Sequence, residues 1–144
     1  MKLCLDTSVL VPALVAAHPH HGAAKSTFER IEGGAGTLVL SAHALAEAYA
    51  TLTALPLTPK ISPTVAARLL RADMLAEAEV VALDGADYAD TLARVAALGL
   101  TSGAIYDALH VRAAEKAGAD ELVTFNGRDF RRFPPAPPTQ LIVL

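Results

Sequence analysis

The stretch Lys2-Leu-Cys-Leu-Asp6 decides the fold, because it is a short apolar run that stops at a carboxylate. A continuous apolar run of this length is typical of a strand that is covered on both faces, as strands of a parallel sheet are. We expect four further strands of the same kind, at Thr37–Leu40, Glu79–Leu83, Glu121–Thr124 and Gln140–Val143. The sequence therefore predicts a five-stranded parallel sheet.

Helical patterns fill the intervals between these runs. Strands that alternate with helices predict an α/β domain with three layers, α/β/α. Ser41 is placed to cap the third helix, Pro63 lies near the start of the fourth, and Gly118 follows the last. The expected helices cover Val9–Ala17, His21–Ile31, Ala42–Leu55, Pro63–Ala78, Ala86–Leu98 and Gly103–Ala117.

The composition agrees with a single domain over residues 1–144. The chain carries 12 Lys and Arg against 15 Asp and Glu, is 53% hydrophobic and is only 19% charged, which excludes a disordered acidic protein. The net charge of −3 also argues against a broad DNA-coating surface. The longest uninterrupted apolar stretch, Val9–Ala17, contains Pro12 and is shorter than the about 20 residues that a membrane-spanning helix needs. We therefore expect no membrane segment.

The N-terminal segment and the single cysteine bear on location. Lys2 followed by Val9–Ala17 faintly resembles a secretory signal, but Asp6 and Pro12 interrupt it, so we interpret the segment as structure. Cys4 cannot form an internal disulfide, which suits a reducing compartment. We expect a cytoplasmic protein.

Asp6 is the first candidate for chemistry, because ligands of an open parallel sheet gather beyond the carboxyl ends of its strands. Asp6 follows the first strand and precedes Thr7 and Ser8, and all three residue types can cap a helix. One helix needs only one such cap. From this residue alone, a capping role and a cation-binding role are equally good interpretations.

Glu47 is the only formally charged residue in the expected helix Ala42–Leu55. It lies among small residues, nearly opposite a stripe formed by Leu45, Tyr49 and Leu52. An ordinary solvated face carries several charged residues, so this pattern indicates a partly enclosed surface. A lone surface Glu on an alanine-rich helix is the alternative.

Asp107 shares a helix face with Ala104, Val111 and Ala114. A buried and unpaired carboxylate is costly, so we expect this one to have a cation or hydrogen-bond donors. A bond to the backbone of a neighbouring loop is the structural interpretation, and a metal ion is the chemical one.

A fourth polar group follows the strand Glu121–Thr124, where Thr124, Asn126 and Asp129 crowd the corner between strand and loop. Asn126-Gly127 alone predicts a turn. Carboxylate and amide oxygens are also the ligands that Mg²⁺ and Mn²⁺ prefer. Carboxylates from separate elements that meet at strand ends fit phosphate chemistry with such ions.

Taken in order, four motifs resemble those of the PIN-domain ribonucleases, in particular the VapC-like toxins of type II toxin–antitoxin pairs. They are Leu5-Asp-Thr-Ser-Val9, Glu47, Tyr106-Asp-Ala108 and Thr124-Phe-Asn-Gly-Arg-Asp-Phe130. Each motif is short, but their order and spacing cover essentially the whole chain. The resemblance implies a small PIN-like α/β/α domain and endonucleolytic cleavage of RNA that depends on Mg²⁺ or Mn²⁺. It also implies a homodimer and a cognate antitoxin that blocks the site.

The resemblance further implies that Asp6, Glu47 and Asp107 bind the metal and act in catalysis. Many relatives have a fourth acidic residue where this chain has Asn126. Asn126 can still coordinate or position water, and Asp129 can supply the missing charge. Thr124 corresponds to a hydroxyl that the family places near its site.

RNA also requires cationic contacts to its phosphates. Arg128, Arg131 and Arg132 cluster beside the fourth motif, and Arg112 and Lys116 lie on the helix that carries the third. We take these five residues as candidates for RNA binding, with ordinary surface charge as the alternative.

Two other functions fit parts of the pattern. A phosphatase that forms an aspartyl-phosphate also begins with an Asp after its first strand, but it usually has a second acid where this chain has Ser8. A catalytically weak PIN-like domain that binds RNA or protein is compatible with Asn126.

The histidine patterns do not indicate a zinc protease. His43 and Glu47 are four residues apart, but the protease motif needs a second histidine that is absent here. The group His18-Pro-His-His21 is more typical of a solvated loop than of a metal site. His110, one turn from Asp107, is expected to pack or to support a ligand.

Overall fold

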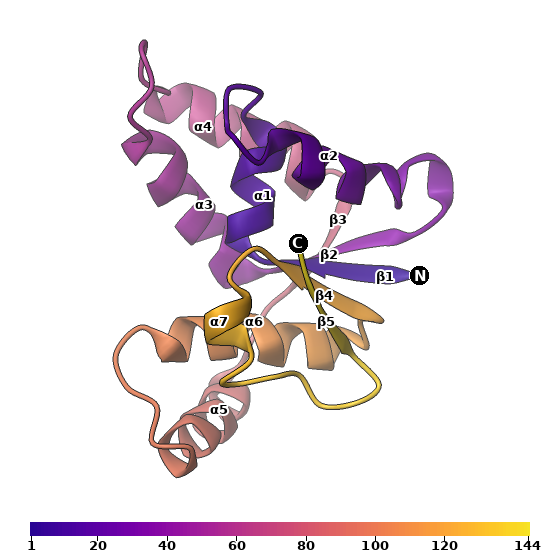
Figure 1. Ribbon diagram of the computed structural model, residues 1–144, viewed down its shortest axis with the longest axis vertical. Helices are drawn as coiled ribbons and strands as arrows, with labels where there is room; N and C mark the ends of the chain where they lie inside the picture. Colours follow the sequence, from indigo (N-terminus) through magenta and orange to yellow (C-terminus); the bar gives the residue numbers. More distant parts are fainter.

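The computed structural model describes residues 1–144 and has a central sheet of five parallel strands in the order β3-β2-β1-β4-β5 (Figure 1). The predicted parallel sheet is confirmed, with β1 in its middle, where Leu3 is paired with Leu38 on one side and Glu121 on the other. The strands are Lys2–Leu5 (β1), Thr37–Ser41 (β2), Ala78–Val81 (β3), Glu121–Thr124 (β4) and Gln140–Val143 (β5).

Helices cover both faces of the sheet, which confirms the predicted three layers. Figure 1 shows α1 to α4 on one side and α5 to α7 on the other. The helices are α1 (Thr7–Leu14), α2 (His21–Glu29), α3 (Ala42–Ala54), α4 (Pro63–Leu69), α5 (Gly85–Ala97), α6 (Ala104–Ala117) and α7 (Gly127–Phe130), with short turns η1 (Glu32–Gly34) and η2 (Leu70–Leu75).

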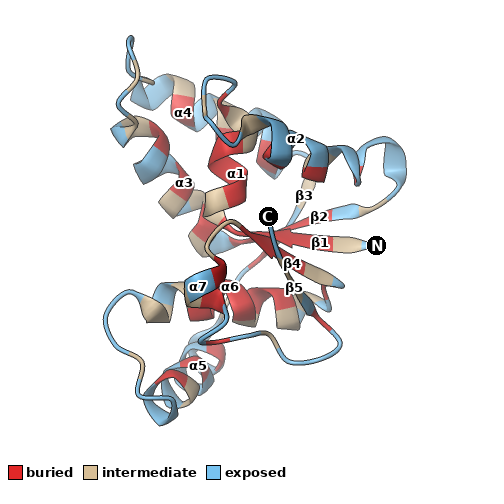
Figure 2. Cartoon of the chain, in the orientation of Figure 1, coloured by how far each residue is buried: buried red, intermediate tan, exposed pale blue.

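The sheet separates two apolar cores, and β1 contributes to both. Leu3 and Leu5 belong to the core beneath α1 to α4, while Cys4 belongs to the core beneath α5 to α7. Successive side chains of a strand point to opposite faces, so an uninterrupted apolar run fills both layers. Figure 2 shows the resulting burial of the central strands and of the inward faces of the helices. Burial also raises the pKa of the Cys4 thiol to about 12, which keeps it unreactive.

The helix boundaries follow the predicted caps. Ser41 accepts a hydrogen bond from the backbone N–H of Ala44 at 3.0 Å, and Pro63 is the first residue of α4. Gly118 ends α6 in the left-handed conformation, at φ +62°, which a residue without a Cβ adopts readily.

Several predicted boundaries are wrong. Helix α1 begins at Thr7 instead of Val9, because the polar residues after β1 already form its first turn. The single helix predicted over Pro63–Ala78 consists of α4 and the wider, π-helical η2, and Ala78 already belongs to β3. The turn predicted at Asn126-Gly127 is the start of α7, a helix too short to show a periodic pattern.

None of the helices is both long and apolar enough to cross a membrane.

Candidate active site

Asp6 lies where β1 ends beside β4, and its side chain is held by hydroxyl groups. Oδ2 accepts hydrogen bonds from Ser8 Oγ at 2.6 Å and from Thr124 Oγ1 at 2.8 Å. Asp6 is buried, and its side chain forms no capping bond to α1. The capping interpretation is therefore wrong, because the carboxylate is turned toward the end of β4.

The same hydroxyl groups tie the loop after β4 to Asp6. Ser8 Oγ accepts a bond from the backbone N–H of Phe125 at 2.9 Å, and Thr124 Oγ1 accepts one from that of Asn126 at 2.8 Å. Asn126 in turn donates to Asp129 Oδ2 at 2.9 Å. The fourth motif is thereby fixed beside the end of β1.

Gly127 allows this loop to pack closely. A Cβ at this position would lie 2.6 Å from Cγ1 of Val143 in β5, closer than side-chain carbons approach. Glycine therefore permits α7 to start directly over the last strand, which places Asp129 at the site.

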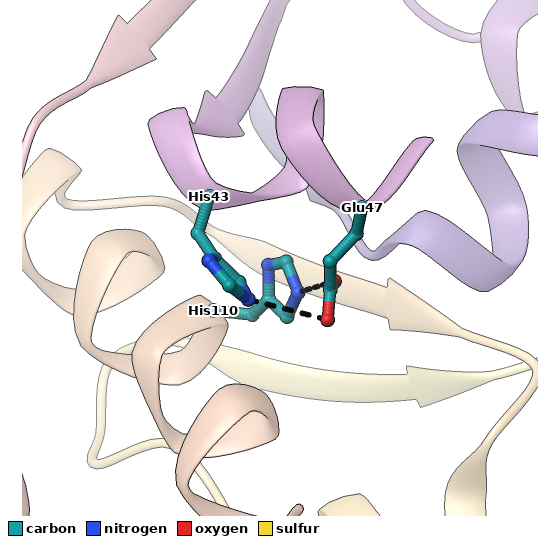
Figure 3. Close-up of side chains that lie close together, drawn as sticks. All are labelled: His43, Glu47 and His110. Atoms are coloured by element: carbon teal, nitrogen blue, oxygen red, sulfur yellow. Dashed lines mark hydrogen bonds and ion pairs between the residues drawn. The ribbon is translucent and has the colours of Figure 1, made fainter. Parts of the chain in front are cut away.

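Glu47 projects from α3 toward α6 (Figure 3). Its Oε2 accepts a bond from Thr7 Oγ1 at 2.8 Å and lies 2.6 Å from His110 Nε2, while Oε1 lies 3.2 Å from His43 Nε2. Burial alone would raise the pKa of Glu47, but His110, Thr7 and His43 outweigh it and lower the pKa to about 2. Glu47 is therefore an ionised carboxylate.

The exposure of residues on α3 bears on the predicted surroundings of Glu47. Its side chain is 32% exposed, in agreement with a partly enclosed surface. In the stripe opposite Glu47, Leu52 is buried and Tyr49 is 40% exposed. The buried residues of α3 are Ala44, Ala48 and Leu52, so alanines let this helix approach the core closely.

His110 is fully buried and connects two of the carboxylates. Its Nε2 pairs with Glu47 at 2.6 Å and lies 3.8 Å from Asp6 Oδ1, while Nδ1 is 2.8 Å from Ser41 Oγ. Burial opposes the protonated form, but the bond to Glu47 and the nearby negative charges raise the pKa of His110 overall. The expectation that His110 packs in the interior is confirmed, and its ring also bonds to Glu47.

Asp107 is half-buried and forms no hydrogen bond or ion pair. Burial is the main factor that raises its pKa to about 6, and the negative charges of Asp6, Asp129 and Glu47 add to the effect. The charge of His110 lowers the pKa of Asp107, but by less than burial and the carboxylates raise it. Asp107 is therefore repelled by the other three carboxylates. We call these four residues the acidic cluster: Asp6, Glu47, Asp107 and Asp129.

The negative charge of the acidic cluster is offset only in part, by His43, His110 and Arg132, and the remainder fits a divalent cation with oxygen ligands. The acidic cluster is open on one side, where a cavity of about 300 Å³ is lined by Asp107, Asp129 and Arg132. The potential ligand atoms of His43, Glu47 and His110 lie within 4.8 Å of one another. The carboxylates of the acidic cluster are spaced more widely than this set. Wider spacing suits Mg²⁺, which keeps several waters and binds through one or two carboxylates.

The five cationic candidates fall into two groups. Arg112 donates two bonds to Asp87 Oδ1, at 2.7 and 3.0 Å, and Lys116 pairs with Asp87 Oδ2. Asp87 is a buried residue of α5, and these pairs lower its pKa. Arg128, Arg131 and Arg132 are exposed beside the acidic cluster. Asp87 is not among the residues predicted from the sequence, because it lies in an ordinary capping motif at the start of α5.

A comparison with protein families matches residues 3–134 to the PIN domain. The chain therefore belongs to the PIN-domain family, as the order of its motifs predicts. Among characterised relatives, it is 39% identical over 127 residues to Ribonuclease VapC27 of Mycobacterium tuberculosis, a match that covers 88% of this chain and 85% of that protein. Ribonuclease VapC40 of the same species is 38% identical over 126 residues.

Solved structures share the fold at lower identity. VapC20 of Mycobacterium tuberculosis, described as a Sarcin-Ricin loop cleaving toxin, has a TM-score of 0.71 at 18% identity and covers 91% of this chain and 95% of its own. VapBC2 from Rickettsia felis, bound to a DNA fragment from its promoter, has a TM-score of 0.69 at 20% identity, with 100% and 99% coverage. These likenesses confirm the PIN fold.

Proposed function

We propose that this chain is an endoribonuclease and the toxin of a toxin–antitoxin pair. The observation that carries the proposal is the acidic cluster at the carboxyl ends of β1 and β4, in a chain whose characterised relatives are VapC ribonucleases. Divalent ions are typical of PIN-domain nucleases, and we infer Mg²⁺ or Mn²⁺ here because the carboxylates supply oxygen ligands. Such an ion lowers the pKa of bound water and stabilises charge on the attacked phosphate.

Within this proposal, Asp6, Glu47 and Asp107 hold the ion. The hydroxyls of Ser8 and Thr124 donate hydrogen bonds to Oδ2 of Asp6 and so fix the orientation of the carboxylate. Asp107 has no partner of its own and is available as a ligand.

Asp129 supplies the fourth carboxylate of the site, and Asn126 orients it. The bond from Asn126 to Asp129 supports this assignment, as does the effect of the Asp129 charge on Asp107. Asn126 stands where the family resemblance implies an acidic residue, and Asp129, three positions further along the chain, supplies the charge.

Three arginines provide the contacts to RNA phosphates. Arg128, Arg131 and Arg132 are exposed on and after α7, adjacent to Asp129. Arg112 and Lys116 are engaged by Asp87, so we leave them out of this surface.

Cleavage of single-stranded RNA by the purified chain tests the enzyme. We expect cleavage in Mg²⁺ or Mn²⁺ that stops in EDTA and falls at least about 100-fold in Asp107→Asn, because the substitution removes a ligand charge. Retained cleavage in the double variant Asp6→Ala with Asp107→Ala would overturn the assignment. Metal binding without cleavage of any RNA tested would favour an RNA- or protein-binding module.

Expression in a bacterial host tests the toxin. We expect growth arrest that disappears in Asp6→Ala and that the product of the neighbouring gene relieves. A hollow of about 680 Å³ offers a surface for such an antitoxin, and its lining mixes apolar residues such as Phe28 and Met74 with charged ones such as Lys25 and Glu77. Arrest that persists in Asp6→Ala would separate toxicity from the nuclease.

We further propose a homodimer. Exposed Tyr88 and Leu92, one turn apart on α5, offer an apolar contact surface that supports it. Light scattering of the purified chain, with and without antitoxin, measures the oligomeric state, and a mass of one chain at all concentrations would exclude the dimer.

A further inference from the structure

His43, Glu47 and His110 bring two imidazoles and a carboxylate together between α3 and α6. Figure 3 shows one ring on each helix, both directed at the Glu47 carboxylate. The ligand atoms all lie within 4.8 Å of one another. Nε2 of His43 is 3.2 Å from Oε1, and Nε2 of His110 is 2.6 Å from Oε2. Two of the three residues are four apart on one helix, which places them on the same face.

The His43 ring leaves a buried polar atom without a hydrogen bond. Its Nε2 is buried and has no correctly oriented partner, although Glu47 lies close. The ring itself is fixed by stacking on Tyr106, with centroids 5.2 Å apart and planes 10° from parallel. Buried polar atoms normally have partners, and a buried nitrogen without one is energetically costly. A cation between His43 and Glu47 would satisfy this nitrogen.

The His110 ring is already oriented in the way of a metal ligand. Its Nδ1 is 2.8 Å from Ser41 Oγ, and Ser41 is itself held as the cap of α3 by its bond from Ala44. Metal-binding histidines usually use their second nitrogen in such a bond, which fixes the ring and leaves the other nitrogen for the ion. Nε2 of His110 therefore faces the cluster, and an ion bound there replaces the proton that this nitrogen shares with Glu47.

We propose that His43, Glu47 and His110 form a second cation site, which shares Glu47 with the acidic cluster and binds a transition metal of the Zn²⁺ class. Imidazole nitrogen suits Zn²⁺ and Co²⁺, whereas Mg²⁺ prefers oxygen ligands. Two histidines and one glutamate form a three-ligand set that leaves a position open for water. The site stands on its own geometry and does not depend on RNA cleavage.

Co²⁺ is the probe, because its visible absorption is strong in a four- or five-coordinate nitrogen site and weak in an octahedral oxygen site. The untagged full-length chain is titrated with Co²⁺ and, by calorimetry, with Zn²⁺. We expect strong absorption at one Co²⁺ per chain in the wild type. His43→Gln should weaken Zn²⁺ binding about tenfold or more and remove the absorption. His43 is partly exposed, so this variant is expected to fold.

Two controls locate the ion. Asp107→Asn should abolish cleavage under the proposed function but change Zn²⁺ affinity less than threefold, so failure of one proposal is distinguishable from failure of the other. The double variant His18→Gln with His20→Gln removes histidines of the α1–α2 loop and should keep the absorption. Equal affinity in wild type and His43→Gln, or loss of binding in either control, would overturn the site.

Discussion

At the scale of single residues, the site depends on hydroxyl groups that hold a carboxylate. Ser8 and Thr124 come from different segments, 116 positions apart, and both donate to the same oxygen of Asp6. A carboxylate fixed in this way is oriented before any ion arrives. Removing one hydroxyl should therefore affect cleavage more than it affects the fold.

Thr124→Val tests this role. The substitution removes the bond donated to Asp6 and the bond accepted from the Asn126 backbone N–H, which should lower the free energy of unfolding by about 2 kcal/mol. Because ligand orientation is lost as well, we expect cleavage in Mg²⁺ to fall about 10- to 100-fold. Initial rates and thermal unfolding measure the two effects.

Thr139→Val is the matched control. Thr139 is also buried and donates to the backbone carbonyl of Ala119 at 2.7 Å, at the opposite end of the sheet. It loses this one bond, should be destabilised by about 1 kcal/mol and should keep its cleavage rate. Equal losses of rate in the two variants would show that Thr124 acts only through stability.

At the scale of elements, Asp87 joins α5 to α6. It accepts bonds from Arg112 and pairs with Lys116, and it also completes the cap of α5 by accepting from the backbone N–H of Asp84 at 3.0 Å. These partners lower the pKa of Asp87 below that of an ordinary aspartate. A carboxyl whose folded pKa is depressed stabilises the fold above its unfolded pKa, about 3.9, and loses this contribution as the pH falls further.

Asp87→Asn should therefore flatten the acid side of the stability profile. At pH 7 the variant should unfold at a lower temperature than the wild type, because two cations lose their partner. The difference should shrink as the pH falls below about 4, because the unfolded wild-type chain takes up a proton at Asp87 there while the folded chain still holds this carboxylate ionised. Asp90→Asn, at an exposed position of the same helix, is the control and should follow the wild type. A difference independent of pH would contradict this.

The contacts of Asp87 also show where sequence reasoning ends. The strands were predictable because apolar runs such as Lys2–Leu5 report burial directly, and Asp6, Glu47 and Asp107 were conspicuous because charges are scarce in this chain. Periodicity does not reveal which helices meet. Arg112 pairs with Asp87 across 25 positions of the chain, and His110 pairs with Glu47 across 63. The residue types alone do not indicate which residues pair.

At the scale of the whole molecule, a net charge of −3 coexists with an exposed group of arginines beside the acidic cluster. Asp6→Ala blocks cleavage and therefore serves as the background for equilibrium binding. The test variant adds Arg131→Ala to this background. Relative to Asp6→Ala alone, we expect weaker binding of single-stranded RNA and a salt dependence shallower by about 0.7 in the log–log slope, for one lost phosphate contact. Arg71→Ala, an exposed arginine of η2, should change neither quantity. An unchanged slope in Arg131→Ala would remove this residue from the RNA surface.

The acidic cluster also makes stability depend on metal. A raised folded pKa means that ionised Asp107 destabilises the metal-free fold at pH 7.5, where it has lost its proton. Asp107→Asn should therefore raise the free energy of unfolding in EDTA by about 1 kcal/mol, since solvent screens part of the repulsion. Mg²⁺ should raise the wild-type unfolding temperature by mass action and raise that of the variant much less. Asp73→Asn, at an exposed position of η2, controls for a general change in charge. A variant that is less stable than the wild type in EDTA would mean that Asp107 has a stabilising partner, and the cluster would then not be poised for a cation.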